Sequence, residues 1–358
     1  MGQQSFRKSS ISQAAPLHEE SVFSDAFDIG VSKIRRNLPE LVAKPGSWGF
    51  DAAGDYSKRV EGFHEIGNWT TSFFTGMALL ANLRTDDEKF LSLVEALDEH
   101  YQRKLENHAA EAMHDLGFLY VLYSVALYRA TGDVRHRDTS VRAAEALAGR
   151  FVSEGGYLRA WGRVDERDTD YAGLAIIDSL MNLSLLYWAA EETGEARFKE
   201  LAVRHADTTL EHFIRMDDSV FHAFRFDQVS GEPVGGENYC GRAVESHWAR
   251  GTSWGMYGFS LSYQHTGDER YLSAALALTE KYVSLLGDEG VPVWDFRLGE
   301  GELPVRDSSS AAVAICAIQN LMSQTQVSPG ISEAKDRMLR ALCSDDYLDR
   351  SLECRGLL

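Results

Sequence analysis

Asp178 is the carboxylate whose place in the sequence most strongly indicates chemistry. It lies in the apolar stretch YAGLAIIDSLMNLSLLYW, which predicts a buried helix with Asp178 near its middle. An ionised carboxylate is costly to bury there, so we expect either a raised pKa or a polar partner. Asn182, one helical turn further on, is the partner that would make Asp178 purely structural. Without such a partner, an acid that keeps its proton near neutral pH suits general acid catalysis.

A second carboxylate, Asp115, stands beside His114 at the head of the apolar run that starts at Leu116. Its position suits a helix N-cap, a structural role that requires no catalytic function. The alternative is that both side chains face a substrate, although a histidine here is as readily a core or surface residue. Two carboxylates from different helical hairpins, brought to the same side of a fold, would fit a glycosidase-like site.

The segment ESHWARGTSWGMYGF places Arg250, Trp254 and Gly258 at helical spacing on one face, as a cation, an aromatic ring and a gap. A guanidinium offers a fork for a carboxylate, and an indole offers a flat surface for a sugar ring. Trp69 and Trp161 invite the same interpretation. The structural alternative is a core tryptophan beside a solvated arginine.

Several classes of function are disfavoured by what the sequence lacks. It has no phosphate-binding glycine loop, no HExxH, no Gly-x-Ser-x-Gly elbow and no dinucleotide fingerprint, so we expect neither a cofactor nor a metal. The net charge of −18 argues against nucleic acid and against an anionic membrane. A small anionic substrate remains compatible if arginines gather locally.

The expected location is the cytoplasm, if the sequence is full length. The first 20 residues contain no apolar stretch for a secretory signal, and Phe6 occupies the position where myristoylation requires Ser or Thr. No run of 18 uncharged apolar residues could span a membrane. The spacing of the four cysteines fits no zinc or redox motif, so we interpret them as reduced thiols.

Apolar residues recur with helical periodicity along most of the chain. The predicted helices lie near 22–43, 70–84, 87–106, 114–130, 135–152, 172–192, 196–214, 248–265, 269–286, 308–324 and 332–344. Three helices end at Thr-Gly followed by an acid, after Thr131, Thr193 and Thr266. Glycine suits the left-handed residue that closes a helix, and the acid suits the start of the next. A weaker copy at Thr85 lacks the glycine.

This repeat predicts an all-α fold of five or six helical hairpins. An open superhelix is possible, but helices that are apolar on several faces favour an inner ring buried by an outer one, an (α/α)6 toroid. We expect a flexible segment at 1–20 and one catalytic domain at 21–358. The intervals 153–171 and 215–247 are predicted loops at one end of the toroid, the second containing a short β-hairpin.

Several segments together resemble the unsaturated glucuronyl hydrolases, glycoside hydrolase family 88. They run in family order over residues 65–325: NWTTSFFTGM, MHDLGFLY, IIDSLMNLSLLYWAA, FHAFRFDQVSGEP, WARGTSWGMYGF, and VPVWDF with DSSSAAVA. The resemblance implies an (α/α)6 barrel and removal of the 4,5-unsaturated uronic acid that polysaccharide lyases leave at the non-reducing end. The implied partner is a small anionic oligosaccharide.

The resemblance also implies roles for individual residues. Asp178 becomes the general acid and base, and Asp115 holds the substrate and tunes Asp178. The residues implied to line the pocket are Trp69, His114, His222, Arg250 and Trp254, with Trp161 a looser match. Because the chain as a whole is acidic, we expect Arg250 together with His222 to supply the positive charge that the uronate carboxylate needs.

The sequence departs from the family near the expected leaving sugar. Thr252 replaces a common Gln, and GRAVESH at 241–247 replaces a Ser/Asp-rich run. Arg242 either selects an anionic leaving sugar or is a solvated residue paired with Glu237 or Glu245. The competing functions are an unsaturated rhamnogalacturonyl hydrolase, a non-catalytic carbohydrate-binding toroid and a helical scaffold for a protein partner.

Overall fold

The computed structural model describes residues 17–45, 69–107, 113–166, 169–353 and 356. Most of the predicted segment 1–20 therefore lies outside the described residues. The helices are α1 Leu17–Ala43, α2 Thr71–Thr85, α3 Glu88–Glu95, α4 Asp98–Glu106, α6 Leu116–Tyr120, the π-helical turn η2 Val121–Val125, α7 Ala126–Thr131, α8 Val134–Ala148, α9 Ser179–Thr193, α10 Ala196–His212, α11 Ala249–Thr266, α12 Glu269–Leu286, α13 Ser308–Gln324 and α14 Pro329–Leu342.

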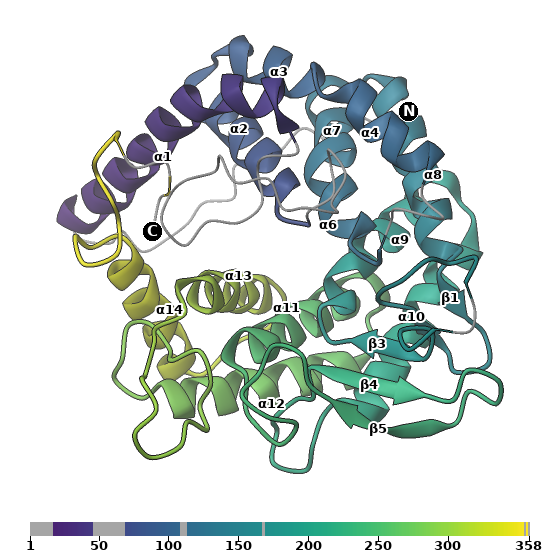
Figure 1. Cartoon of the computed structure of the whole chain (residues 1–358). Coiled ribbons are helices and arrows are strands. Elements are labelled where there is room, and N and C mark those ends of the chain that lie inside the picture. Colours follow the sequence, from purple (N-terminus) through teal and green to yellow (C-terminus); the bar gives the residue numbers. More distant parts are fainter. Residues whose placement is uncertain (1–16, 46–68, 108–112, 167–168, 354–355, 357–358) are drawn as a thin grey trace.

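These helices follow one another around a ring (Figure 1). An inner layer is formed by α2, the α6–η2–α7 segment, α9, α11 and α13, each of which contacts the next. The outer layer consists of α1, α3 with α4, α8, α10, α12 and α14. The ring closes where α1 meets the C-terminal segment, through ion pairs of Asp25 with Arg350 and of Lys33 with Asp349. The closed toroid is thus confirmed, and the open superhelix is wrong.

Burial follows the two layers. The inner helices α9 and α11 are buried along most of their length, with polar residues such as Ser179, Asn182 and Ser253 buried beside the apolar ones. Inner helices also approach closely at glycines: a Cβ on Gly117 would lie 2.3 Å from the Asn182 Cα, and one on Gly258 would lie 2.3 Å from the Leu180 Cβ. The gap predicted at Gly258 is therefore filled by helix packing rather than by a ligand.

The repeated Thr-Gly turn closes three inner helices in the same way. In each, the threonine hydroxyl donates to the carbonyl four residues earlier, at 2.7–2.8 Å, and accepts the N–H two residues later, at 3.1 Å. Gly132, Gly194 and Gly267 adopt left-handed φ angles of 72°, 76° and 72°. In the copy without glycine, Asp86 takes the left-handed conformation instead, with φ 57°.

Two small antiparallel sheets lie beside the helices. Strand β1 Phe151–Val152 pairs with β2 Tyr157–Leu158, and β3 Leu174–Ile176, β4 Ala223–Phe226 and β5 Pro233–Glu237 form a second sheet in that order. The predicted hairpin at β4 and β5 is confirmed.

Two predicted helices are wrong at one end because a strand forms there instead of a helical turn. The predicted helix 172–192 begins only at Ser179, because residues 174–176 pair with β4 instead of continuing a helical turn. A short buried apolar run does not distinguish strand from helix. The predicted helix 135–152 likewise ends at Ala148, and its last two residues form β1.

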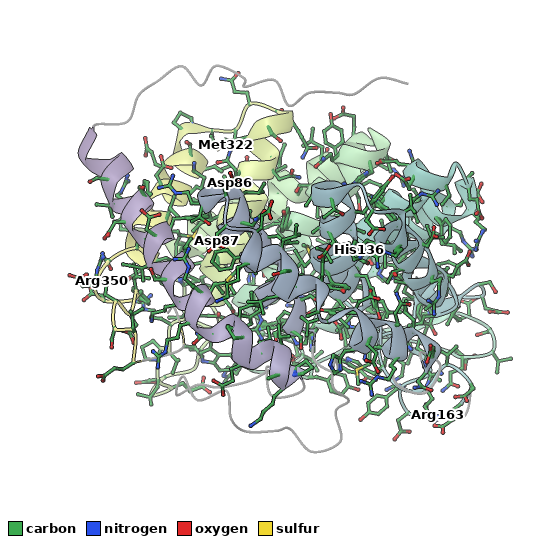
Figure 2. The ribbon with its side chains drawn as sticks, turned by 90° about the horizontal axis from the view of Figure 1, so that it is seen from above. Asp86, Asp87, His136, Arg163, Met322 and Arg350 are labelled. Atoms are coloured by element: carbon green, nitrogen blue, oxygen red, sulfur yellow. The ribbon has the colours of Figure 1, made fainter. Side chains whose placement is uncertain are left out.

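Because the chain alternates between outer and inner helices, the inner helices all run in the same direction, and their N-terminal ends lie at one face of the ring. Figure 2 separates the two faces: Arg163, in the loop after β2, lies at the opposite side of the molecule from Met322 and Asp86, which are near the C-terminal ends of α13 and α2. Every predicted inner-helix site residue except Trp254 stands at or just before an N-terminal end. In the described part of the chain, no helix is long and apolar enough to cross a membrane.

Candidate active site

Asp178 occupies the N-cap position of α9 rather than its middle. Its side chain makes no capping hydrogen bond, and its Oδ2 has no hydrogen-bond partner among the described residues. Burial raises the pKa of Asp178 to about 7; the charge of Arg250 opposes this rise, and that of Asp115 adds to it. The side chain remains 18% exposed. The geometry therefore presents a carboxylic acid that holds its proton near neutral pH.

The structural alternative for Asp178, satisfaction by Asn182, is wrong. The Asn182 Oδ1 accepts the backbone N–H of Phe118 at 2.7 Å, which fixes the orientation of the amide. Its Nδ2 lies 3.3 Å from the His114 Nδ1 and 3.5 Å from the backbone carbonyl of Asp178. Asn182 thus joins α9 to the start of α6 and does not bond to the Asp178 carboxyl.

Asp115 has the same unusual position at the start of α6, an N-cap residue whose side chain makes no capping bond. Its Oδ1 lies 3.4 Å from the His114 Nε2. Burial raises the pKa of Asp115 to about 7, against the charges of Lys104 and Arg150. Capping therefore does not explain this carboxylate.

His114 lies behind Asp115 and is only 1% exposed. Because the Asn182 Nδ2 is a donor, and the Ser179 Oγ lies 2.9 Å from the same nitrogen, the His114 Nδ1 acts as an acceptor. The proton then sits on Nε2 and faces Asp115. Burial lowers the pKa of His114 to about 3, with a smaller effect from Arg150. His114 is thus a neutral link between Asp115 and α9 rather than a lining residue.

His222 is held in the same tautomer. Its Nδ1 accepts the backbone N–H groups of Tyr239 and Cys240 at 2.9 and 3.1 Å, so Nε2 carries the proton and lies 3.9 Å from the Asp178 Oδ2. Burial lowers the pKa of His222 to about 3, and the charge of Arg250 lowers it further. The expectation that His222 supplies positive charge is therefore wrong, because the ring is neutral at physiological pH.

Arg250 is the cation whose charge acts on both Asp178 and His222. Its guanidinium lies over the Trp248 ring, 4.8 Å from the centroid, and contacts the Asp307 Oδ2 at 3.4 Å and the Ser309 Oγ at 3.2 Å. Asp307 and Ser309 lie at the start of α13. The arginine side chain stays 29% exposed, so it can bind an anion without leaving its contacts.

The predicted tryptophans divide into two groups. Trp254 is 3% exposed and packs against Trp69 and Phe118, with ring centroids 6.2 and 5.3 Å away, so it belongs to the core under the site. Trp69 is partly buried in the same cluster. Trp161 is half-buried and lies beside His222, with 6.1 Å between the ring centroids, so it stands outside that cluster.

Arg242 pairs with Glu302, not with Glu237 or Glu245. Its side chain is 40% exposed. Thr252, the other departure from the family, is fully buried, and its hydroxyl donates to the Trp248 carbonyl at 3.1 Å within the helix. Of Arg242 and Thr252, only Arg242 presents a polar group to solvent.

Two supporting residues were not found by sequence reasoning. The fully buried carboxylate of Asp295 accepts the backbone N–H groups of Arg242, His247 and Arg297, at 2.9, 3.0 and 3.0 Å, and so fixes the 241–247 loop. Arg150 is buried near Asp115 and donates to carbonyls of the Trp161 loop. The only sequence signal for Asp295 was its place in VPVWDF, and Arg150 had none.

These groups form one chemical unit. Two carboxyl groups with pKa values near neutral, a neutral histidine beside each of them and one accessible guanidinium suit proton transfer to an anionic sugar.

Comparison with known proteins agrees with this chemistry. Residues 53–265 match the model of Glycosyl Hydrolase Family 88. The chain is 34% identical over 294 residues to the unsaturated chondroitin disaccharide hydrolase of Streptococcus agalactiae serotype III (strain NEM316), covering 81% of this chain and 73% of that protein.

Solved structures agree as well. The unsaturated glucuronyl hydrolase of Bacillus sp. GL1, described as responsible for glycosaminoglycan degradation, superposes with a TM-score of 0.84 at 28% identity, covering 94% of this chain and 88% of that one. An unsaturated glucuronyl hydrolase specific for heparin gives a TM-score of 0.79 at 28% identity, with coverages of 92% and 86%.

Proposed function

This chain belongs to glycoside hydrolase family 88, and from that membership we propose that it removes the 4,5-unsaturated uronic acid from the non-reducing end of lyase-generated oligosaccharides. The observation that carries the proposal is Asp178, whose pKa is raised to about 7 by burial and whose Oδ2 has no hydrogen-bond partner in the described part of the chain. Such a group can deliver a proton at neutral pH.

The proposed reaction begins at the vinyl ether of the substrate. Asp178 transfers its proton to C4, and the C4=C5 electron pair forms the new C–H bond. The positive charge left at C5 is shared with the ring oxygen. Water adds at C5 and returns a proton to the Asp178 carboxylate, so one residue serves as acid and then as base. The hemiketal then opens and releases the leaving sugar. Because no displacement occurs at the anomeric carbon, the carboxylate-separation rule for glycosidases does not apply.

Asp115 is proposed to act in its ionised form. Its charge is one cause of the raised pKa of Asp178, so an ionised Asp115 helps Asp178 to keep its proton. The two nearby cations, Lys104 and Arg150, favour ionisation of Asp115 itself. In this proposal Asp115 is the charged carboxylate and Asp178 is the protonated carboxylic acid.

Arg250 is proposed to bind the uronate carboxylate, and Trp161 to stack on the leaving sugar. The partly exposed guanidinium of Arg250, whose charge acts on Asp178, supports the first role. The half-buried Trp161 ring beside His222 supports the second. The Nε2–H of the neutral His222 ring lies 3.9 Å from the Asp178 Oδ2, so it can donate to a substrate bound beside Asp178.

The identity of the leaving sugar is a separate proposal. The similar proteins are named for chondroitin disaccharides and for heparin, so family membership leaves this choice open. We propose that Arg242 contributes to selection of an anionic leaving sugar, with Glu302 holding part of its charge in the free enzyme. Arg242 is two residues from Cys240, whose N–H orients His222.

The test is the loss of ultraviolet absorbance of the C4=C5 bond on adding the full-length protein to unsaturated disaccharides. The panel contains disaccharides from hyaluronan, chondroitin, heparin, gellan and rhamnogalacturonan. We expect turnover of at least one uronyl disaccharide, with activity lost in Asp178→Asn. Absence of turnover across the panel would reject the function, and turnover of the rhamnogalacturonan product alone would assign the sister activity.

We also propose that the enzyme works in the cytoplasm. Among the described residues, Cys240, Cys316 and Cys343 are free thiols, which supports a reducing compartment. Fractionation of the producing cells with an antibody against the chain tests this proposal, and recovery outside the cytoplasm would reject it.

A further inference from the structure

Arg150 places a guanidinium beneath the candidate active site. It follows α8 and is 2% exposed. Its Nε donates to the carbonyl of Arg159 at 2.9 Å, and its terminal nitrogen donates to the carbonyls of Ala160 at 3.3 Å and Gly162 at 3.0 Å. A planar fork with five N–H groups can serve three carbonyls of one short loop, which an ammonium group cannot do with the same geometry.

The loop that Arg150 binds carries Trp161. A second guanidinium, that of Arg159, donates to the Trp161 carbonyl at 2.9 Å. Every carbonyl from residue 159 to residue 162 therefore accepts a bond from one of these two arginines. The Trp161 ring rests on this peptide and meets Tyr239 and His222, at 4.9 and 6.1 Å between centroids.

The same peptide is also linked to Asp115, through His114. The carbonyl of Ala160 also accepts the backbone N–H of His114 at 3.0 Å, and His114 in turn faces the Asp115 Oδ1 from its Nε2 at 3.4 Å. One carbonyl thus joins Arg150 to His114, the neighbour of Asp115. A displacement of the loop would therefore move Trp161 together with His114 and Asp115.

Arg150 also acts on Asp115 through its charge. The ionisable groups that face Asp115 are His114 on the same loop, Lys104 from α4, Arg150 after α8 and Asp178 at the start of α9. Of these, Lys104 and Arg150 lower the pKa of Asp115 against the effect of burial. Burial lowers the pKa of Arg150 to about 9, so it remains cationic at neutral pH.

We propose that Arg150 is a positioning residue for the hydrolysis of unsaturated uronyl oligosaccharides, because its guanidinium fixes both the Trp161 peptide and the segment that carries His114 and Asp115. The inference rests on the proposed function. It assigns two separable effects to one side chain: the hydrogen bonds place the surface that meets the leaving sugar, and the charge keeps Asp115 ionised.

Three variants separate these effects. Arg150→Lys keeps the charge but cannot reproduce the bonds to three carbonyls. Arg150→Met removes both. Arg159→Met is the matched control, since Arg159 supports the Trp161 carbonyl but is not among the charges that act on Asp115. The readouts are KM and kcat between pH 5 and pH 9 on a disaccharide that the wild type cleaves, with circular dichroism to check folding.

We expect all three variants to raise KM about three- to tenfold, the equivalent of one aromatic contact. Only Arg150→Met should also move the acidic limb of the kcat profile to higher pH, by about one unit, because Asp115 then ionises less readily. An Arg150→Met enzyme with unchanged KM and unchanged profile would overturn the proposal, as would an equal shift of the acidic limb in Arg159→Met.

If Arg150→Met does not fold, Arg150→Lys decides the matter. A raised KM with an unmoved acidic limb supports the positioning role, and an unchanged KM overturns it. Failure of the proposed function has a different signature, since the wild-type enzyme would then leave every unsaturated disaccharide intact.

Discussion

Asp178→Asn should make the protein more stable while it abolishes activity. Burial holds the pKa of this carboxyl at about 7, whereas an unfolded aspartate titrates near its ordinary value of 3.8. Between these two values the folded state binds more protons than the unfolded state, so stability falls as pH rises. Above pH 7 the folded protein must hold an ionised carboxylate in a site that disfavours the charge. A neutral asparagine of the same shape removes this cost.

The magnitude follows from the two pKa values. Each unit between them corresponds to about 1.4 kcal/mol, so the stability gained by Asp178→Asn should grow by about 2–3 kcal/mol between pH 5 and pH 8. The turnover number should fall by about a thousandfold or more, because the amide cannot supply a proton.

The assay is urea unfolding of the wild type and of Asp178→Asn at pH 5, 6, 7 and 8, with turnover measured on the same preparations. Asp346→Asn, at an exposed position, is the control for a general effect of removing one negative charge. A gain that is the same at pH 5 and at pH 8, or a loss of stability at pH 8, would refute the raised pKa. Retained turnover would refute the role of Asp178 as the acid.

Three further predictions concern other parts of the molecule. The kcat profile should fall on the alkaline side near pH 7, where Asp178 loses the proton that its raised pKa retains, and a flat profile from pH 5 to pH 9 would contradict this. Asp86→Gly should stabilise the fold by about 0.5–1 kcal/mol in thermal unfolding, and Gly267→Ala should destabilise it by about 1 kcal/mol, because both positions are left-handed; opposite signs would contradict the turn argument. Arg242→Ala should raise KM for sulfated disaccharides about tenfold, roughly 1.4 kcal/mol, while Glu302→Gln lowers it; equal effects on unsulfated substrates would reject Arg242 as the selector.

The sequence was sufficient to predict the ring of helices because the signals are local. Helical periodicity and the Thr-Gly turns each involve residues within a few positions of one another, and Thr131, Thr193 and Thr266 make the bonds that such a turn requires. The strand at 174–176 was missed because its partner, β4, lies about 50 residues away in the chain. Trp254 was misjudged because a helical face does not reveal whether it meets a ligand or a neighbouring helix.

The site could be predicted only in part, because its electrostatics depend on contacts between distant segments. Asp115 and Asp178 were recognisable as carboxylates beside apolar runs. The tautomer of His114 depends on Ser179 and Asn182, which lie 65 and 68 positions further along the chain. The carbonyl-bound Arg150 has no pattern at all in the sequence, since its partners are backbone atoms that any residue could supply.

The position of the two aspartates explains why capping and chemistry looked like alternatives in the sequence. Both residues do occupy N-cap positions, yet neither side chain makes the capping bond. An N-cap aspartate that bonds the first turn contributes about 1 kcal/mol to stability and lowers its own pKa. Asp115 and Asp178 do not make this stabilising bond, and burial raises the pKa of both. Two N-cap aspartates at one face whose side chains make no capping bond therefore indicate that these carboxylates are kept available for something other than the helices that follow them.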